Sequence, residues 1–195
     1  MQQSKIETKR KNEAEYGAYS PLSDLIQGCI LENRMAQKHL YMRFYSQLFG
    51  TALRYTRNRE EAQEVLNNAF LKIFGSIKTF QTAGSFGAWI NKIVIYTSID
   101  YLRKYAKFKD TAPLEYAANI TLPNHTIEQM SADEIYELLS ALSPTTRAVF
   151  SMYAIDGFKH KEIAKILNFS PNTSKWYFAK AKKELQQLII EQEKN

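Results

Sequence analysis

The residues best suited to chemistry lie near the C-terminus, where polar, basic and aromatic side chains recur at helical spacing. They are Asn172, Lys175, Trp176, Lys180 and Lys183. Lysine ammonium groups bind phosphate, and an asparagine amide can pair with the edge of a base. No acid interrupts the set, so the chemistry that it indicates is the binding of a polyanion such as DNA.

These side chains need a helix to carry them, and residues 158–188 have the pattern of a helix, a four-residue turn and a second helix. Asn168 suits the positive φ that ends a helix, Ser170 is a good N-cap, and Pro171 fits the first helical position. The second helix has one stripe that should be buried, formed by Ser174, Phe178, Ala181, Leu185 and Leu188. The pattern predicts a helix-turn-helix, whose second helix usually enters the DNA major groove.

An ordinary helical hairpin with a solvated lysine face is the alternative to a DNA-binding motif. Length and charge alone support the two interpretations about equally. The chemistry of the turn and the absence of acids on the exposed face favour DNA binding.

A second basic and aromatic stretch covers residues 103–109, where lysines alternate with Tyr105 and Phe108. Such a stretch can bind single-stranded nucleic acid, because rings stack on bases while lysines contact phosphates. Cations at the C-terminus of a helix also complement the helix dipole, and this explanation has about equal weight.

Catalytic and metal-binding patterns are missing from the sequence. The three histidines are far apart, and no two of them have the spacing of metal ligands or of a base and its nucleophile. No glycine-rich phosphate loop and no dinucleotide-binding motif occurs. We therefore expect no catalytic residue, no cofactor, no bound metal and no small-molecule substrate.

The composition favours an intracellular protein with a polyanionic partner. The chain has 195 residues and a formal net charge of +6. Its single cysteine, Cys29, excludes an internal disulfide and a cysteine-based zinc site, which fits a reducing compartment. The N-terminus has no apolar signal segment, and no apolar run approaches the roughly 20 residues that span a bilayer. We expect a cytoplasmic protein.

Helical periodicity without a persistent strand pattern predicts an all-α chain with two small domains joined by a flexible linker. Residues 1–20 are polar and aperiodic, so we expect a flexible tail. Residues 21–109 form the N-terminal domain, with Ser23 as the N-cap of its first helix and Trp89 in its core. Its predicted helices are 24–30, 33–56, 59–74 and 86–106.

Residues 110–127 contain prolines and asparagines without a period, and they are predicted to be the linker. Residues 128–195 form the C-terminal domain. It begins with an amphipathic helix near Leu138, continues with a helix capped by Ser143, and ends with the helix-turn-helix.

Three segments, in this order, resemble the extracytoplasmic-function (ECF) sigma factors, the minimal two-domain group of the sigma-70 family. The first includes AQEVLNNAFLKIF at 62–74. The second includes FGAWINKI at 86–93 and IDYLRK at 99–104. The third runs from LSP at 142–144 to Leu185. A helix-turn-helix alone is a weak signal, whereas the three segments together are a specific one.

The resemblance implies a partner and a task for each domain. The N-terminal domain would bind the clamp of core RNA polymerase through the helix at 59–74 and capture the melted −10 element of a promoter. The residues implied for polymerase binding are Glu60, Glu61, Glu64, Asn67 and Asn68. The family often has an acid at position 68 and a glutamine at 67, so the three glutamates would carry more of this contact.

The melted strand requires stacking rings and a pocket for an extruded base, which the loop before residue 86 and the following helix could supply. Arg103 and Lys104 would contact phosphates. The full set of candidate −10 contacts is Phe80, Gln81, Ser85, Asn91, Lys92, Tyr96, Arg103 and Lys104.

The C-terminal domain would bind the polymerase flap and recognise the −35 element. Asn172, Lys175 and Trp176 lie near the N-terminal end of the recognition helix, where base contacts are usual. The residues better placed for phosphates are Thr173, Lys180 and Lys183. Trp176 and Tyr177 are bulkier than the family's usual residues, which suggests an unusual −35 sequence or a surface covered by a partner.

The protein would thus direct promoter-specific initiation of transcription while the polymerase performs the chemistry. The resemblance also implies an anti-sigma factor as a partner, of the kind that is often anchored in a membrane. A dimeric helix-turn-helix regulator that binds duplex DNA without polymerase is the alternative. Such a regulator would not need an acidic third helix together with an aromatic, basic fourth helix.

Overall fold

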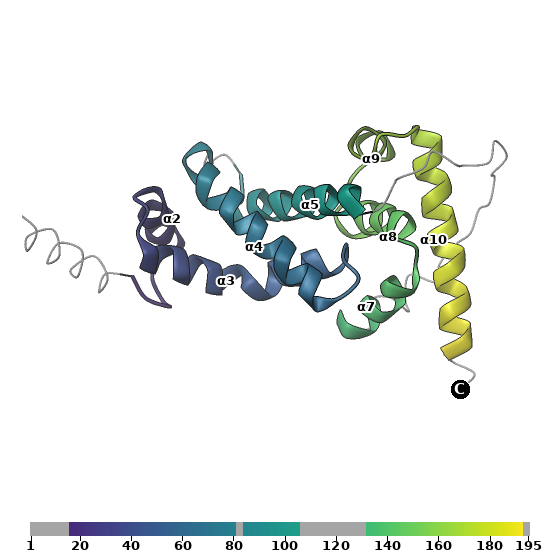
Figure 1. Ribbon diagram of the computed structural model, residues 1–195, viewed down its shortest axis with the longest axis horizontal. Helices are drawn as coiled ribbons and strands as arrows, with labels where there is room; N and C mark the ends of the chain where they lie inside the picture. The colour runs from purple at the N-terminus through teal and green to yellow at the C-terminus, as the bar shows by residue number, and fades with distance from the viewer. Residues whose placement is uncertain (1–15, 81–83, 106–131, 193–195) are drawn as a thin grey trace, which may run out of the picture. The chain divides into compact units, whose positions relative to one another are not determined.

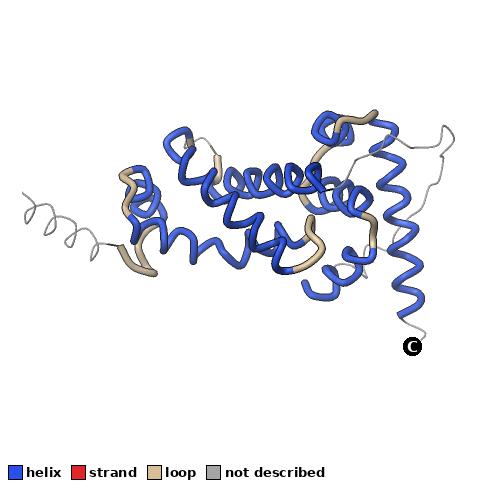
Figure 2. Tube along the Cα trace, in the orientation of Figure 1, coloured by secondary structure: helices blue, strands red, loops and turns tan. Residues whose placement is uncertain are grey.

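The computed structural model describes residues 16–80, 84–105 and 132–192, and these residues fold entirely into helices and short connections, as predicted (Figure 2). The predicted linker at 110–127 lies outside them, as does most of the predicted tail. The helical elements, labelled in Figure 1, are α2 (Leu22–Ile30), α3 (Arg34–Leu53), α4 (Arg59–Ser76), the 3₁₀ turn η1 (Ile77–Thr79), α5 (Phe86–Tyr105), α7 (Ala132–Ala141), α8 (Pro144–Phe150), the π-helical turn η2 (Ser151–Ile155), α9 (His160–Leu167) and α10 (Pro171–Gln192). No helix in these ranges is both long enough and apolar enough to cross a membrane.

The chain divides into two compact units. The first holds the described residues up to Ala52 together with Gln63–Thr97. The second holds Leu53–Ala62 and the described residues from Ser98 onward. The segment Leu53–Ala62 therefore groups with the C-terminal helices.

The first unit is built around apolar side chains from α2, α3, α4 and α5. Fully buried members include Leu40, Leu66, Ile73 and Ile90. Helix α3 begins where the Asn33 carboxamide oxygen accepts the backbone N–H groups of the second and third helical residues at 2.9 and 3.0 Å, which is a side-chain N-cap.

The start of the first unit differs from the prediction in two ways. Pro21, not Ser23, precedes α2, and the Ser23 hydroxyl donates to Asp24 instead of capping the helix. Part of the predicted tail is also attached, because the Arg43 guanidinium donates to the backbone carbonyls of Ala18 (3.0 Å) and Ser20 (2.7 Å). These carbonyls follow no sequence periodicity, so the contact could not be anticipated.

Close packing of α2 onto α3 depends on Gly28. A Cβ atom at Gly28 would lie 2.5 Å from the Cβ of Ala36 and 2.7 Å from the Tyr16 ring. No side chain fits in this space, so the glycine sets the distance between the two helices.

The second unit has its core where α10 packs along α8 and α9 and also touches α7 (Figure 1). One apolar cluster there consists of Leu138, Leu139, Leu142, Phe150, Ala181 and Leu185. Ser143 is the N-cap of α8 as predicted, since its hydroxyl accepts the Thr146 N–H at 3.4 Å and Pro144 is the first helical residue.

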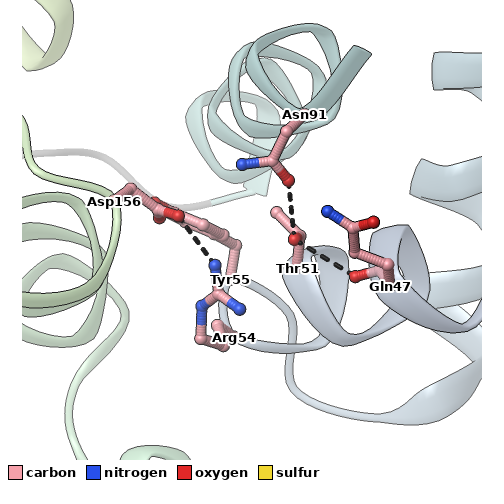
Figure 3. A network of polar contacts seen from close by, with 6 residues as sticks. All are labelled: Gln47, Thr51, Arg54, Tyr55, Asn91 and Asp156. Carbon is pink, nitrogen blue, oxygen red and sulfur yellow. Dashed lines mark hydrogen bonds and ion pairs between the residues drawn. The ribbon is translucent and has the colours of Figure 1, made fainter. Parts of the chain in front are cut away.

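The second unit contains a buried polar cluster formed by Arg54, Tyr55 and Asp156. Asp156 directly follows the π-helical turn into which α8 continues. The Asp156 carboxylate accepts a hydrogen bond from Arg54 (2.8 Å; Figure 3) and another from the Tyr55 hydroxyl (2.6 Å). Tyr55 is fully buried, and its burial together with the Asp156 charge raises the pKa of its phenol. Short π-helical turns are rare and often mark functional or strained positions.

Candidate nucleic-acid interface

The helix-turn-helix forms as its turn chemistry predicts. Asn168 ends α9 in the left-handed conformation (φ 59°, ψ 53°), and the Phe169 N–H reaches back to the Ala164 carbonyl at 3.0 Å. The Ser170 hydroxyl accepts the Thr173 N–H at 3.0 Å, and α10 begins at Pro171. The turn thus fixes where α10 starts and which face it presents.

The predicted buried stripe of α10 is confirmed. Ser174, Ala181 and Leu185 are buried, while Phe178 and Leu188 are partly buried against the core. Ser174 also has a polar role, because its hydroxyl lies 2.9 Å from His160 Nδ1 at the start of α9.

His160 is half-buried against two aromatic rings. Its imidazole stacks on Tyr153 with ring centroids 4.1 Å apart, and its centroid lies 5.9 Å from that of Phe178. Desolvation by this burial, and then the charge of Lys175, lower the pKa of His160. The neutral imidazole is therefore the form that the folded unit favours.

The opposite side of α10 carries most of the predicted DNA contacts. Asn172, Lys175 and Lys183 are exposed, and Trp176 and Lys180 are half-buried. The Lys180 ammonium lies 5.3 Å from the centre of the Trp176 ring, within the range of a cation–π contact. It also lies 3.7 Å from Glu184 one turn later, so an acid does border this face.

Two neighbouring residues are placed differently from what the sequence suggested. Thr173 is only 3 % exposed, and its hydroxyl lies 2.8 Å from that of Ser170, so it takes part in the helix start. Tyr177 is 6 % exposed, with its ring 5.9 Å from that of Phe169. The buried arc of α10 is thus wider than one stripe, and Tyr177 is a packing residue.

In the first unit, an open pocket of about 410 Å³ lies beside the start of α5. Phe80 forms one wall, and its ring meets Phe86 edge-on at 5.1 Å and Trp89 at 5.4 Å. The lining residues are Thr79, Phe80, Gly84, Ser85, Ala88, Trp89 and Lys92. Three predicted −10 contacts therefore share this pocket, while a fourth, Gln81, lies outside the described residues.

Trp89 was expected in the core, and this expectation is wrong. It is half-buried, and it lines the pocket with its ring 5.6 Å from that of Phe86. Its apolar neighbours along the chain suggested a buried position, but Trp89 lies at the edge of that stripe, next to the loop.

The remaining residues predicted for the −10 element are spread along α5. Asn91 faces α3, where its carboxamide oxygen accepts the Thr51 hydroxyl at 2.8 Å (Figure 3). Tyr96 is 44 % exposed. Arg103 and Lys104 are exposed, and Arg103, in the second unit, donates to the Ile166 carbonyl and pairs with Asp100 at 3.5 Å.

The residues predicted for polymerase binding all lie on α4. Glu60 and Glu61 are in its first turn, where acids complement the helix dipole. Glu64, Asn67 and Asn68 are exposed further along.

Asn67 is held in place, since its carboxamide oxygen accepts from Gln63 (2.9 Å) and from the Tyr41 hydroxyl (3.3 Å). On the same exposed face, Leu71 is 71 % exposed, a residue that the sequence pattern had not singled out. Its only sequence signal is that it lies four residues after Asn67.

Within the described residues, no group of three or more histidine, cysteine or acidic side chains is arranged to hold a metal ion. Cys29 is buried, and desolvation raises the pKa of its thiol to about 12, so the thiolate form is disfavoured at neutral pH.

Two parts of the chain match known family regions. Residues 40–108 match sigma-70 region 2, and residues 132–185 match sigma-70 region 4. Together they cover more than half of the chain. The pocket lies in the first match and the helix-turn-helix in the second.

Curated relatives agree with these matches. The chain is 26 % identical over 167 residues to the ECF RNA polymerase sigma factor SigM of Mycobacterium tuberculosis, covering 86 % of this chain and 84 % of the relative. It is 22 % identical over 173 residues to the RNA polymerase sigma factor YlaC of Bacillus subtilis, covering 85 % and 94 %.

Solved structures of similar chains include CnrH in complex with the cytosolic domain of CnrY (19 % identity, TM-score 0.46, covering 85 % of this chain and 94 % of that one). They also include the sigma factor RpoE with the anti-sigma factor NepR from Bartonella quintana (18 %, 0.48, 78 % and 95 %). The matched regions, their order and the curated relatives lead to one conclusion: this chain is a sigma factor that belongs to the ECF group of the sigma-70 family.

Proposed function

We propose that this protein binds core RNA polymerase and selects promoters through two separate surfaces, with residues 21–109 binding the polymerase clamp and the −10 element and residues 128–195 binding the flap and the −35 element. Residues 110–127 would connect them. The observation that carries the proposal is the presence, in a chain with sigma-70 regions 2 and 4, of an aromatic-walled pocket and a basic recognition helix.

The basic recognition helix suits duplex DNA. Asn172, Lys175 and Trp176 lie in the first half of α10 and would contact base edges. Lys180 and Lys183 follow one and two turns later and would contact phosphates. Each phosphate contact adds affinity and salt dependence without adding sequence information.

The pocket suits a base that has left the stack. A base inside a duplex cannot present its Watson–Crick edge, so a protein that recognises it must hold it extruded, usually between aromatic rings. Phe80 and Trp89 offer such rings, Ser85 offers a hydroxyl, and the exposed Lys92 offers a charge for a neighbouring phosphate. Because the rings carry no base-specific groups, the polar side chains would give any preference among bases.

Polymerase binding is assigned to the exposed face of α4. Glu64, Asn68 and Leu71 are all exposed there, and Asn67 is held by two hydrogen bonds. An exposed leucine among polar groups can form the apolar centre of an interface, with the polar groups as its rim.

We also propose that the protein has no catalytic activity of its own, because the polymerase forms the phosphodiester bonds. An anti-sigma factor remains a predicted partner. A membrane protein encoded beside this gene would be the first candidate to test by co-expression and co-purification.

The proposal is tested by mixing the purified protein with core RNA polymerase. It should co-purify with the core enzyme and support run-off transcription from a subset of promoters. Lys175→Ala and Trp176→Ala should change the −35 preference, whereas Lys183→Ala should weaken all promoters alike. Tight dimeric binding to a palindrome in the absence of polymerase would instead support a conventional regulator.

A further inference from the structure

Asn172, Trp176 and Lys180 form a row on α10, since residues four apart on a helix lie one above another. The neighbouring Thr173, Ser174 and Tyr177 are buried and face the core. Two large apolar side chains in the first half of the helix remain partly exposed, Trp176 and Phe178. Phe178 packs against the core cluster, so Trp176 is the one that belongs to this row, where base contacts would be made.

The Trp176 ring is held in one orientation by its neighbours. Tyr177 meets it nearly edge-on, with centroids 4.8 Å apart and planes at 75°. The Lys180 ammonium lies 5.3 Å from the ring centre and is itself 3.7 Å from Glu184. A ring that is ordered before binding loses little side-chain entropy on contact with DNA.

The chemistry of an indole limits what Trp176 can recognise. It has one N–H donor and no acceptor, so it cannot form the paired hydrogen bonds by which arginine selects guanine or asparagine selects adenine. What it offers is a flat apolar surface. In the major groove, the apolar group that base edges display is the 5-methyl of thymine.

We propose that Trp176 makes this protein select a thymine in the −35 element, by packing its ring against the 5-methyl group of that base. The inference rests on the proposed function, in which α10 binds promoter DNA. Asn172, one turn earlier in the row, can hydrogen-bond to an adjacent base pair, so the thymine would lie within about two base pairs of that contact.

The experiment uses the full chain in complex with core RNA polymerase. A promoter library with a randomised −35 element is first transcribed, and the enriched sequences are determined. Each thymine in the enriched element is then replaced singly by deoxyuridine, which pairs identically but lacks the methyl group. One replacement should lower the apparent affinity of the holoenzyme about fourfold, the factor expected for one buried methyl group.

The variants assign that effect to Trp176. In Trp176→Ala the deoxyuridine replacement should no longer change the affinity. Trp176→Gln keeps a side chain of moderate length without the apolar ring, and it should lose the effect as well while keeping the helix-turn-helix folded by circular dichroism. Lys183→Ala lies on the same helix and should bind every template more weakly while retaining the fourfold effect.

The proposal is overturned if the enriched −35 element contains no thymine, if no deoxyuridine replacement lowers the affinity, or if the effect persists in both Trp176 variants. These outcomes can be distinguished from failure of the proposed function. If the proposed function were wrong, the wild-type holoenzyme would give no promoter-specific transcript from the library, whatever base stands in the −35 element.

Discussion

The two candidate DNA-binding surfaces are supported in different ways. The pocket of the first unit is walled by rings that pack on one another, with Phe80, Phe86 and Trp89 all within 5.1 to 5.6 Å of each other. The recognition helix of the second unit also packs on apolar residues, but its start is fixed by hydrogen bonds of Ser170 and His160.

This difference predicts how substitutions should destabilise each surface. Apolar packing depends on volume, so the pocket should collapse when one ring is removed. Hydrogen bonds depend on each partner being present, so the second unit should lose stability in smaller steps, or in one large step where a charge is left buried.

The strongest test of the apolar support is Phe86→Ala. Phe86 is 5 % exposed, and its ring lies against Phe44 as well as the two pocket rings. We expect the free energy of unfolding to fall by about 3 to 5 kcal/mol, from lost burial and from the cavity that remains. Urea denaturation followed by circular dichroism measures this loss.

Leu71→Ala is the matched control, because Leu71 is exposed and its truncation should change the unfolding free energy by less than about 0.5 kcal/mol. A loss in Phe86→Ala no larger than in this control would show that the rings do not support the pocket.

The strongest test of the polar contacts within the second unit is Asp156→Ala, which removes the carboxylate bonded to Arg54 and Tyr55. The change would leave Arg54 and the Tyr55 hydroxyl without their shared carboxylate in a largely buried place, where the side-chain exposures of Arg54 and Asp156 are 20 % and 5 %. We expect a loss of about 3 kcal/mol, the scale for removing one partner of a buried ion pair. Urea denaturation measures this loss in the free energy of unfolding.

Two companion variants make this result interpretable. Tyr55→Phe removes one hydrogen bond and should cost about 1 kcal/mol. Lys78→Ala breaks the exposed pair of Lys78 with Glu32, whose side chains are 64 % and 82 % exposed, and should have almost no effect. Equal losses in Asp156→Ala and Lys78→Ala would contradict a buried polar support.

The sequence predicts those features whose cause is local. Ser143, Asn168 and Ser170 are recognisable because capping and left-handed helix ends depend on one residue type and its nearest neighbours. The face of α10 follows from a period of 3.6 residues. The predicted start of α2 was wrong because two nearby residues, Ser23 and Pro21, both suit a helix N-terminus. The helix follows Pro21, whose ring fixes φ near the helical value.

Features that depend on residues far apart could not be predicted. Tyr55 and Asp156 are about one hundred positions apart, and nothing in either local pattern indicates the other. Trp89 was misplaced for another reason: its pocket is formed by nearby residues, but a tryptophan among aliphatic residues fits a core as well as a pocket edge. Periodicity gives the face of a helix but not what packs against it.

A smaller effect should follow from removing the cap of the recognition helix. In Ser170→Ala, the Thr173 N–H loses its acceptor at 3.0 Å, and we expect a loss of about 1 kcal/mol. Ser143→Ala is the matched variant on α8, where the equivalent bond is longer at 3.4 Å and the loss should be smaller. Thermal denaturation of both proteins at one pH ranks the two caps, and the reverse order would contradict this account.

The smallest effect should be a pH dependence that originates at His160. Burial and the charge of Lys175 lower its pKa in the folded state, so between that pKa and the ordinary value of about 6.5 the unfolded chain binds more protons. The contribution is complete above pH 6.5 and is lost as the pH falls through the folded pKa. The unfolding free energy should therefore decrease on acidification below pH 6.5, as measured by urea denaturation at closely spaced pH values.

The two causes can be separated by two variants. His160→Gln keeps a polar group near Ser174 and should flatten this part of the profile, while Lys175→Gln removes the nearby charge and should only make it shallower, because desolvation is the larger cause. A His160→Gln profile parallel to that of the wild type would assign the dependence to other groups.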